Sequence, residues 1–236
     1  MPSCIDVSVV IPVHNGESFV ADAIDSVRAQ KGFSIEIIVV DNNSTDATVQ
    51  VVVDRYGDSV IVVEEPRPYP ARARNAGCRR ASGALLAFLD ADDIWAPEKL
   101  TRQLDQWDHH PEANLVFSLG QEFYSPELSL HQIESFTRRP DPYPLLTASS
   151  FLIKLDTFRT IGDFPEVPAG EFIAWYGWAQ ELGMRAFVVP EVLVRRRIHA
   201  HNTTRQSDSL AGYTLAVKWL LDQRRARANT YRKPTA

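Results

Sequence analysis

The sequence has 236 residues, of which 44% are hydrophobic and 23% are charged, and its formal net charge is −5. These values are ordinary for a globular protein, so they exclude a fibrous or largely disordered chain, and the negative charge gives no reason to expect a nucleic-acid partner. Cys4 and Cys78 lack the spacing of a metal site or a disulfide framework. No apolar run approaches the roughly 18 residues of a membrane span, and no secretory signal opens the sequence. We therefore expect a soluble, cytoplasmic protein.

Strands and helices alternate in the first half of the sequence. We predict strands over 6–13, which is rich in β-branched residues, and over the apolar segments 35–41, 59–65, 84–90 and 114–119. Helices are predicted between them from apolar spacing or from start and stop residues, over 19–27, 44–57, 71–81 and 97–107. This alternation favours a parallel, doubly wound sheet.

The alternation weakens beyond Leu119. Residues 120–144 contain four prolines, so irregular structure is expected there. Further on we predict a strand and a short helix within 149–164, a helix over 172–183 and a strand over 185–199 that Pro190 interrupts. A terminal helix is predicted over 209–227. The sequence shows no internal repeat.

Polar residues follow three of the predicted strands. They are Pro12, His14, Asn15 and Glu17 after the first, Asp41, Asn42 and Asn43 after the second, and Asp90, Asp92 and Asp93 after the fourth. In an open parallel sheet, ligands bind beyond the carboxyl ends of the strands. Adjacent carboxylates repel one another, and a hard divalent cation such as Mg²⁺ relieves this while also binding substrate phosphates. A single acid after a strand is more often a helix cap, but three converging loops favour a metal site with a phosphorylated ligand.

Four segments together resemble the successive signatures of the family 2 inverting glycosyltransferases of the GT-A fold. They are "VSVVIPVHNGESFVADAIDSVRAQ", "EIIVVDNNSTDAT", "ARARNAGCRRASGALLAFLDADD" and "SSFLIKLDTFRTIGDF". The resemblance spans about Val7 to Asn202. It implies an α/β GT-A fold, with a doubly wound, mostly parallel sheet in the nucleotide-binding half and a smaller, mixed acceptor-side half. It also implies a metal-dependent enzyme that moves a sugar from a nucleotide diphosphate sugar to an acceptor hydroxyl in a single, inverting displacement.

The same resemblance implies how the chain is divided and which residues form the site. One domain would cover 1–206, with a nucleotide-sugar-binding half over 1–119 and an acceptor half over 120–206, followed by a C-terminal helix and basic tail over 207–236. The implied nucleotide contacts are Pro12, Val13, His14, Glu17, Asp41, Arg74, Asn75, Asp90 and Ala91. The implied ligands of Mg²⁺ or Mn²⁺ are Asp92 and, within "RRRIHAHNTT", His199, although a lone histidine is often structural.

The family places its general base, an acid, shortly before a helix that contains tryptophan. In "AGEFIAWYGWAQELG" this position is Glu171, four residues before Trp175. The family's usual acidic pair ending in Asp is here Gly170 and Glu171, so Asp163 is a rival. A glutamate in a first helical turn is also favoured by the helix dipole alone. Trp175 and Trp178 are consistent either with a sugar platform or with core packing.

The resemblance favours a uridine diphosphate sugar as donor, with thymidine as the competing nucleoside. Asp41 ends the second strand, at the position where an acid of the family accepts a hydrogen bond from the pyrimidine ring. A nucleotide-sugar-binding protein without catalysis and a sugar-nucleotide nucleotidyltransferase are alternatives, although no glycine-rich phosphate loop follows the first strand. The sequence does not decide whether the acceptor is a small molecule, a glycan, a lipid-linked group or a peptide.

Residues 224–236 carry five basic residues and no acid. This tail is consistent with peripheral contact with anionic lipid, with nucleic acid, or with a solvated helix end.

Overall fold

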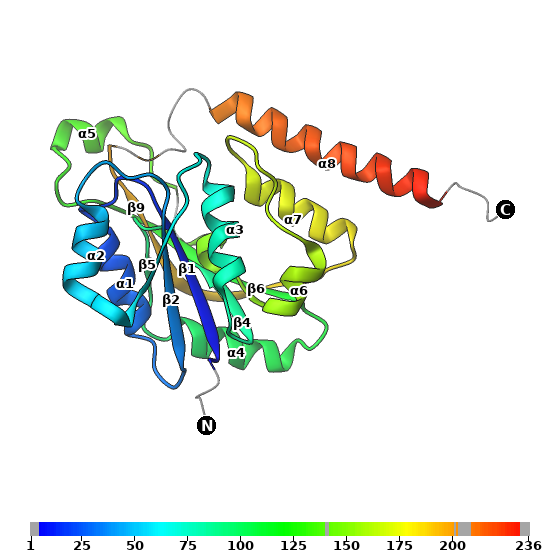
Figure 1. Cartoon of the computed structure of the whole chain (residues 1–236), viewed down its shortest axis with the longest axis horizontal. Helices are drawn as coiled ribbons and strands as arrows, with labels where there is room; N and C mark the ends of the chain where they lie inside the picture. The colour runs from blue at the N-terminus through cyan, green and yellow to red at the C-terminus, as the bar shows by residue number, and fades with distance from the viewer. Residues whose placement is uncertain (1–4, 140–141, 201, 203–208, 232–236) are drawn as a thin grey trace.

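The computed structural model describes residues 5–139, 142–200, 202 and 209–231 (Figure 1). Among these, nine strands form one sheet in the order β3-β2-β1-β4-β8-β6-β9-β5, and β7 pairs with β6. The predicted first strands are confirmed as β1 (Val7–Val13), β2 (Ile35–Asp41), β3 (Ile61–Glu64) and β4 (Leu85–Phe88). These four strands are mutually parallel, as the alternation predicted.

Both faces of this parallel half are buried beneath helices, which explains why its strands are almost continuously apolar. Along β1, Val9 and Ile11 belong to one core cluster, whereas Val10 belongs to the other. The first cluster is covered by α1 (Val20–Arg28), α2 (Thr48–Tyr56) and α4 (Lys99–His109). The second is covered by α3 (Pro70–Arg80), α6 (Leu155–Ile161) and α7 (Glu171–Glu181).

Gly77 allows α3 to lie directly on the sheet. A Cβ atom at this position would come within 2.3 Å of Val10 Cγ1, so any larger residue would push the helix away. Arg74 lies three residues earlier on α3, nearer the carboxyl ends of the strands. The close packing at Gly77 therefore fixes where the Arg74 side chain emerges.

The second half of the sheet is mixed. β8 (Leu152–Lys154) runs antiparallel to β4 and to β6 (Leu115–Tyr124), while β6 and β9 (Ala186–Ile198) are parallel. The short strands β5 (Ile94–Trp95) and β7 (Tyr143–Leu145) pair antiparallel with β9 and β6. The proposed division between residues 119 and 120 falls inside β6, so that strand is common to both halves.

One expectation about irregular structure needs correction, and the interruption predicted at Pro190 takes the form of a bulge. The region 120–144 was expected to be irregular, but β6 continues to Tyr124 and α5 (Leu130–Ser135) follows, with a capping box at Ser129. Pro190 does not end its strand. The β6–β9 register shifts from Ser118 opposite Val189 to Leu119 opposite Val192, so Pro190 lies in a bulge where no ladder hydrogen bond is required of it.

The terminal helix α8 (Ser209–Tyr231) is confirmed and lies alongside α7 (Figure 1). Trp175 on α7 is fully buried among Phe151, Phe158 and Phe164, and its indole N–H donates to the carbonyl of Gly162 at 2.7 Å. Of the two roles considered for Trp175, the structure therefore supports core packing and not a sugar platform. No helix in the described part of the chain has both the length and the apolar character needed to cross a bilayer.

Candidate active site

A cleft of about 1030 Å³ opens beyond the carboxyl ends of β1 and β4. Its wall comes from the segments that follow β1 and β4, the start of α3, residues 126–127 and the end of β9. Nine of the twelve predicted site residues line it: Pro12, Val13, His14, Glu17, Arg74, Asp90, Ala91, Asp92 and His199. Asp41, Asn75 and Glu171 do not.

Side chains tie the loop after β1 to the loop after β2. The Asn15 N–H donates to Ser44 Oγ at 2.9 Å, and the Gly16 N–H donates to Thr48 Oγ1 at 2.8 Å. The carboxylate of Glu17 accepts from the N–H of Ala47, just before α2, at 2.8 Å. These contacts use the helix-start residues that the sequence shows at 44–48, and they hold one wall of the cleft in place. The exposed His14 lies on this wall, with Nδ1 2.9 Å from the carbonyl oxygen of Asn42.

Backbone strain is concentrated around the cleft. Asn15, Asn43 and Tyr69 have positive φ angles, at 51°, 63° and 94°, and they are the non-glycine residues of the described chain that do so. Asparagine tolerates this region, but an aromatic residue there is an outlier that its surroundings must hold. Tyr69 immediately precedes Pro70 in the cleft wall, so the strain lies where α3 enters the site.

Asp41 is buried, with 8% of its surface exposed, and lies behind its neighbour Asn42, which does line the cleft. The Asp41 carboxylate accepts from the Ser44 N–H at a long 3.3 Å. Asn42 donates to the carbonyls of Glu65 and Arg67, both at 2.7 Å, and so ties the end of β2 to the segment after β3. The Asp41 carboxylate therefore lies next to the cleft but outside its wall.

Arg74 joins the cleft to the start of α7. Its Nη2 lies 2.5 Å from Asp90 Oδ1, and its Nη1 contacts Glu171 Oε1. Arg74 and Glu171 are 6% and 8% exposed. Burial alone would lower the pKa of Arg74, but the charges of Asp90 and Glu171 raise it by more than burial lowers it. The net pKa shift is therefore upward, and the guanidinium stays charged. Arg74 Nε is buried and has no hydrogen-bond partner among the described residues.

Asn75 does not face the cleft, which corrects its assignment as a nucleotide contact. Its side-chain amide donates to the carbonyl of Phe164 and accepts from the N–H of Phe164, both at 2.9 Å. Both polar groups of Asn75 are therefore used to hold the segment before α7. The rival base Asp163 has a 62% exposed side chain whose carboxylate lies 3.9 Å from Arg79, near the C-terminal end of α3 and outside the cleft wall.

The three acids after β4 differ in environment. Asp92 Oδ2 lies 2.9 Å from His199 Nε2 and accepts from the side-chain amide of Asn202 at 3.1 Å. Asp93 is buried and accepts from the Arg197 N–H at 3.2 Å. Burial first, and then the charges of Asp92 and Asp90, raise the pKa of Asp93 well above its usual value. The crowding of acids inferred from the sequence is thus present.

The side chains at this position can bind a divalent cation only if other ligands complete its coordination shell. The described residues contain no group of three carboxylate, histidine or cysteine side chains placed to bind one ion. Asp92 and His199 supply one carboxylate oxygen and one imidazole nitrogen. Because Mg²⁺ usually takes one or two carboxylates and completes its shell with phosphate oxygens and water, these two side chains suit a metal that arrives with a diphosphate.

Polar cleft residues that the sequence analysis did not select include Glu127 and Asn202. Glu127 lies in the proline-rich region that gave no signal, and it faces the cleft with its carboxylate accepting from Ser125 Oγ at 2.5 Å. Burial raises the pKa of Glu127, but that hydrogen bond and the charges of Arg197 and His199 lower it overall. Asn202, which contacts Asp92, lies within the quoted "RRRIHAHNTT" segment, although only His199 was selected from it.

The family model of glycosyl transferase family 2 matches residues 8–161, which is more than half of the chain. The chain belongs to this family. An uncharacterised glycosyltransferase of Rickettsia prowazekii is 28% identical over 84% of this chain and 65% of its own length. The succinoglycan biosynthesis protein ExoO of Rhizobium meliloti is 36% identical over 44% of this chain and 30% of its own length. The chain therefore spans less than two thirds of either relative.

Solved structures show the same fold at low sequence identity. S. aureus TarS 1–349 in complex with UDP-GlcNAc superposes with a TM-score of 0.70 at 18% identity, over 91% of this chain and 66% of that TarS fragment. The mannosyltransferase PcManGT from Pyrobaculum calidifontis, in complex with GDP-Man and Mn²⁺, gives 0.66 at 21% identity, over 92% of this chain and 65% of PcManGT. These likenesses confirm the GT-A fold expected for the family.

Proposed function

We propose that this chain transfers a sugar from a nucleoside diphosphate sugar to an acceptor hydroxyl, with inversion, in one catalytic domain over 1–206. The observation that carries the proposal is the arrangement of acids around Arg74. Asp90 and Asp92 line the cleft, and Arg74 connects Asp90 to Glu171 at the N-terminal end of α7. A single displacement needs a leaving-group site and a base close together, and these residues supply one candidate for each.

Asp92 and His199 are the proposed ligands of Mg²⁺ or Mn²⁺, with Asp90 on the ribose or diphosphate. The bound metal would stabilise the negative charge that grows on the departing diphosphate. The nearby Arg197 is 5% exposed, and its Nε donates to the carbonyl of Asp92 at 3.0 Å, so its cation lies beside the proposed metal position. The complex of PcManGT with Mn²⁺ supports this choice of metals by analogy.

Uridine diphosphate is the preferred nucleotide in this proposal. Asp41 lies against the cleft with weak hydrogen bonds, so its carboxylate is able to accept from a pyrimidine ring N–H. The complex of TarS with UDP-GlcNAc supports uridine for this chain by analogy, whereas the complex of PcManGT with GDP-Man supports guanosine. Thymidine presents the same ring N–H as uridine and is the closest competitor.

Glu171 is the proposed general base. It would remove the proton from the acceptor hydroxyl as that oxygen attacks the anomeric carbon. Its carboxylate lies behind Arg74, which holds it in place and keeps its charge compensated in the buried setting. For proton transfer the carboxylate must reach the acceptor, so we expect the Arg74–Glu171 contact to loosen when donor phosphates attract the guanidinium.

A binding protein without catalysis is the main alternative, because it would keep Asp41, Asp90 and Asp92 but need no base. A thermal-shift screen of nucleotide sugars, with and without Mn²⁺, tests donor binding first. A ligand at 100 times its dissociation constant raises the free energy of unfolding by roughly 2.7 kcal/mol. We expect UDP-sugars with Mn²⁺ to give the largest shift. Release of UDP from the best donor, with added acceptor alcohols, then separates transfer from binding alone.

A further inference from the structure

One side of helix α8 packs closely against α7. A Cβ atom on Gly212 would come within 2.7 Å of Ala169, and a Cβ atom on Gly177 would come within 2.7 Å of Leu220 Cδ2. Further along, the Arg224 guanidinium lies 2.6 Å from the Glu181 carboxylate. These contacts follow the same order along α8 and along residues 169–181, which contain α7, so the two helices run side by side in the same direction.

The opposite side of α8 exposes apolar side chains. Val217 and Leu221, four residues apart and thus on one face, are 54% and 42% exposed. Ile173 on α7 is 55% exposed and lies level with Val217, because Gly170 and Gly177 on either side of it contact α8 near Ala216 and Leu220. For two parallel helices in this register, the 3.6-residue repeat places Ile173 and Val217 on the same side of the pair. We call these three residues the apolar ridge.

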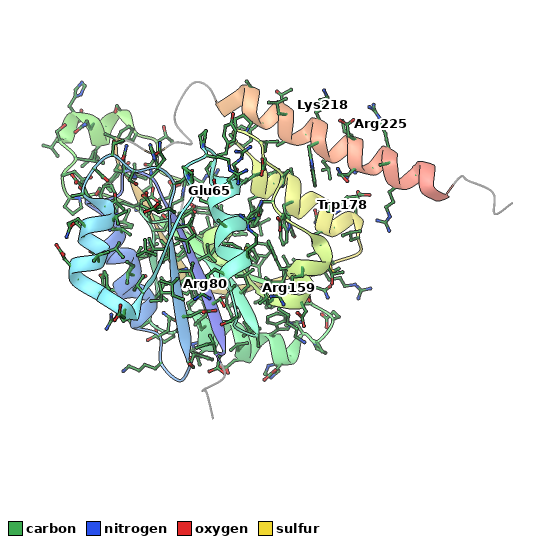
Figure 2. The ribbon with its side chains drawn as sticks, in the orientation of Figure 1. Glu65, Arg80, Arg159, Trp178, Lys218 and Arg225 are labelled. Carbon is green, nitrogen blue, oxygen red and sulfur yellow. The ribbon has the colours of Figure 1, made fainter. Side chains whose placement is uncertain are left out.

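Basic residues lie beside the apolar ridge. Figure 2 shows Lys218 and Arg225 projecting from α8 on the side away from α7, and both side chains are exposed. Within Ser209–Tyr231 there are four basic residues and one acid, Asp222, in a chain whose net charge is −5. Cations are therefore concentrated on the element that also exposes aliphatic side chains.

We propose that the outer side of the α7–α8 pair docks onto an anionic lipid bilayer. The apolar ridge would enter the boundary between headgroups and acyl chains, while Lys218 and Arg225 contact anionic headgroups, as on interfacial amphipathic helices. Ile173 lies two residues after Glu171, so a bilayer bound here lies beside the N-terminal end of α7. This inference concerns where the protein binds and does not depend on its transferring a sugar.

Charge complementarity distinguishes lipid from a second copy of this chain. In a two-fold symmetric dimer the same surface forms both sides of the interface, so Lys218 and Arg225 of the two copies would be brought together, and these like charges repel. An anionic bilayer instead presents apolar chains to the ridge and negative charge to both cations. A nucleic acid would satisfy the cations but leave Val217, Leu221 and Ile173 against a charged backbone.

Flotation with phosphatidylcholine vesicles, with and without 30% phosphatidylglycerol, tests the proposal on the full chain. The double variant Lys218→Glu/Arg225→Glu should bind the anionic vesicles at least about 25-fold more weakly than wild type, since each lost cation costs roughly fivefold in affinity and each new carboxylate adds repulsion. The control Lys31→Glu/Arg80→Glu changes the net charge equally at exposed positions away from α8 and should bind as wild type does. Val217→Ser should weaken binding about fivefold, whereas Val53→Ser, at a similarly exposed valine on α2, should not.

Melting by circular dichroism checks that every variant is folded before its binding is compared. Failure of the wild type to float with anionic vesicles overturns the proposal. Equal losses in the α8 variant and in the Lys31→Glu/Arg80→Glu control overturn it as well, because binding would then follow net charge alone. Sedimentation velocity provides a third check: a wild-type dimer that Val217→Ser dissociates would assign the ridge to a second copy of the chain and not to lipid.

Discussion

The Arg74 guanidinium connects Asp90 and Glu171, two acids from separate parts of the fold. One Nη atom lies 2.5 Å from Asp90 Oδ1, two residues after β4, and the other contacts Glu171 at the first position of α7. Asp90 lines the cleft, whereas Glu171 is buried behind Arg74. Arg74 is therefore a single side chain that links the donor side of the cleft to the proposed base.

This connection predicts strong coupling between two substitutions. Arg74→Met leaves the 8% exposed Glu171 without its cation and should lower the free energy of unfolding by about 3–5 kcal/mol. Adding Glu171→Gln removes the uncompensated charge, so the double variant should be more stable than Arg74→Met alone. Urea unfolding of the wild type, the two single variants and the double variant measures this. If the losses of unfolding free energy in the two single variants sum to the loss in the double variant within about 0.5 kcal/mol, the two side chains are independent.

Glu171→Gln should separate binding from chemistry. A base acts on the acceptor, so the amide should lower turnover by about 10²–10⁴-fold. Donor binding should not weaken, because losing the Glu171 charge leaves the Arg74 guanidinium available to donor phosphates. Asp163→Asn is the matched control, because Asp163 is exposed and outside the cleft wall, and it should transfer at the wild-type rate. Comparing donor affinity with turnover in the same preparation of each variant is the measurement. Near-normal transfer by Glu171→Gln would move the role of base to another acid, with Glu127 the first to examine.

Asp41→Ala tests the choice of nucleotide. The substitution leaves a pyrimidine N–H without its acceptor, which should weaken UDP binding by about 1–3 kcal/mol, or roughly 5- to 150-fold. Competition of UDP and GDP against a labelled donor gives both affinities. The proposal for uridine is contradicted if GDP competes as well as UDP against the wild-type protein.

Alternation and strand-end chemistry were enough to predict the parallel half of the sheet and the location of the cleft. β1, β2 and β4 are continuous apolar runs that end in polar residues, and their register places those ends at one edge. The direction of β8 was not predictable in this way, because a three-residue strand carries no signal for antiparallel pairing with β4. β5, with two residues, gave no pattern at all.

Individual side-chain roles were harder to predict than the site itself. Asn75 follows Arg74 directly, yet on a helix adjacent residues point about 100° apart, so one faces the cleft and the other faces Phe164. Trp175 stayed open between a sugar platform and core packing, because sequence alone does not show which face of α7 packs on the sheet. Glu127 comes from a segment whose prolines favoured irregular structure, and only the folded chain places it opposite Arg197 and His199.

Lys99 predicts an unusual dependence of stability on pH. Its side chain is fully buried, with Nζ 2.7 Å from Gln103 Oε1 and 4.0 Å from the centre of the Trp95 ring, and burial lowers its pKa well below the ordinary value. Between that lowered pKa and about 10.4, the unfolded chain binds one more proton at this position than the folded chain, so the free energy of unfolding rises with pH.

Lys99→Met removes this contribution. The stability of wild type relative to Lys99→Met should increase by about 1.4 kcal/mol per pH unit as pH rises through this window. Urea unfolding of both proteins at a series of pH values between 5 and 10 measures the difference, in which all other titrating groups cancel. Parallel curves over this whole range would contradict a lowered pKa of Lys99 in the folded chain.

Calorimetric titration of UDP into wild type and Asp92→Asn, each with and without Mn²⁺, tests the central claim most directly. The claim is that a nucleoside diphosphate binds beside Asp92 through a shared metal. We predict that Mn²⁺ tightens UDP binding to wild type by at least tenfold, and that Asp92→Asn loses most of this gain while melting at the wild-type temperature. Asp58→Asn, an exposed aspartate away from the cleft, should keep the gain in full. An equal effect of Mn²⁺ on UDP binding to wild type and to Asp92→Asn would contradict the account.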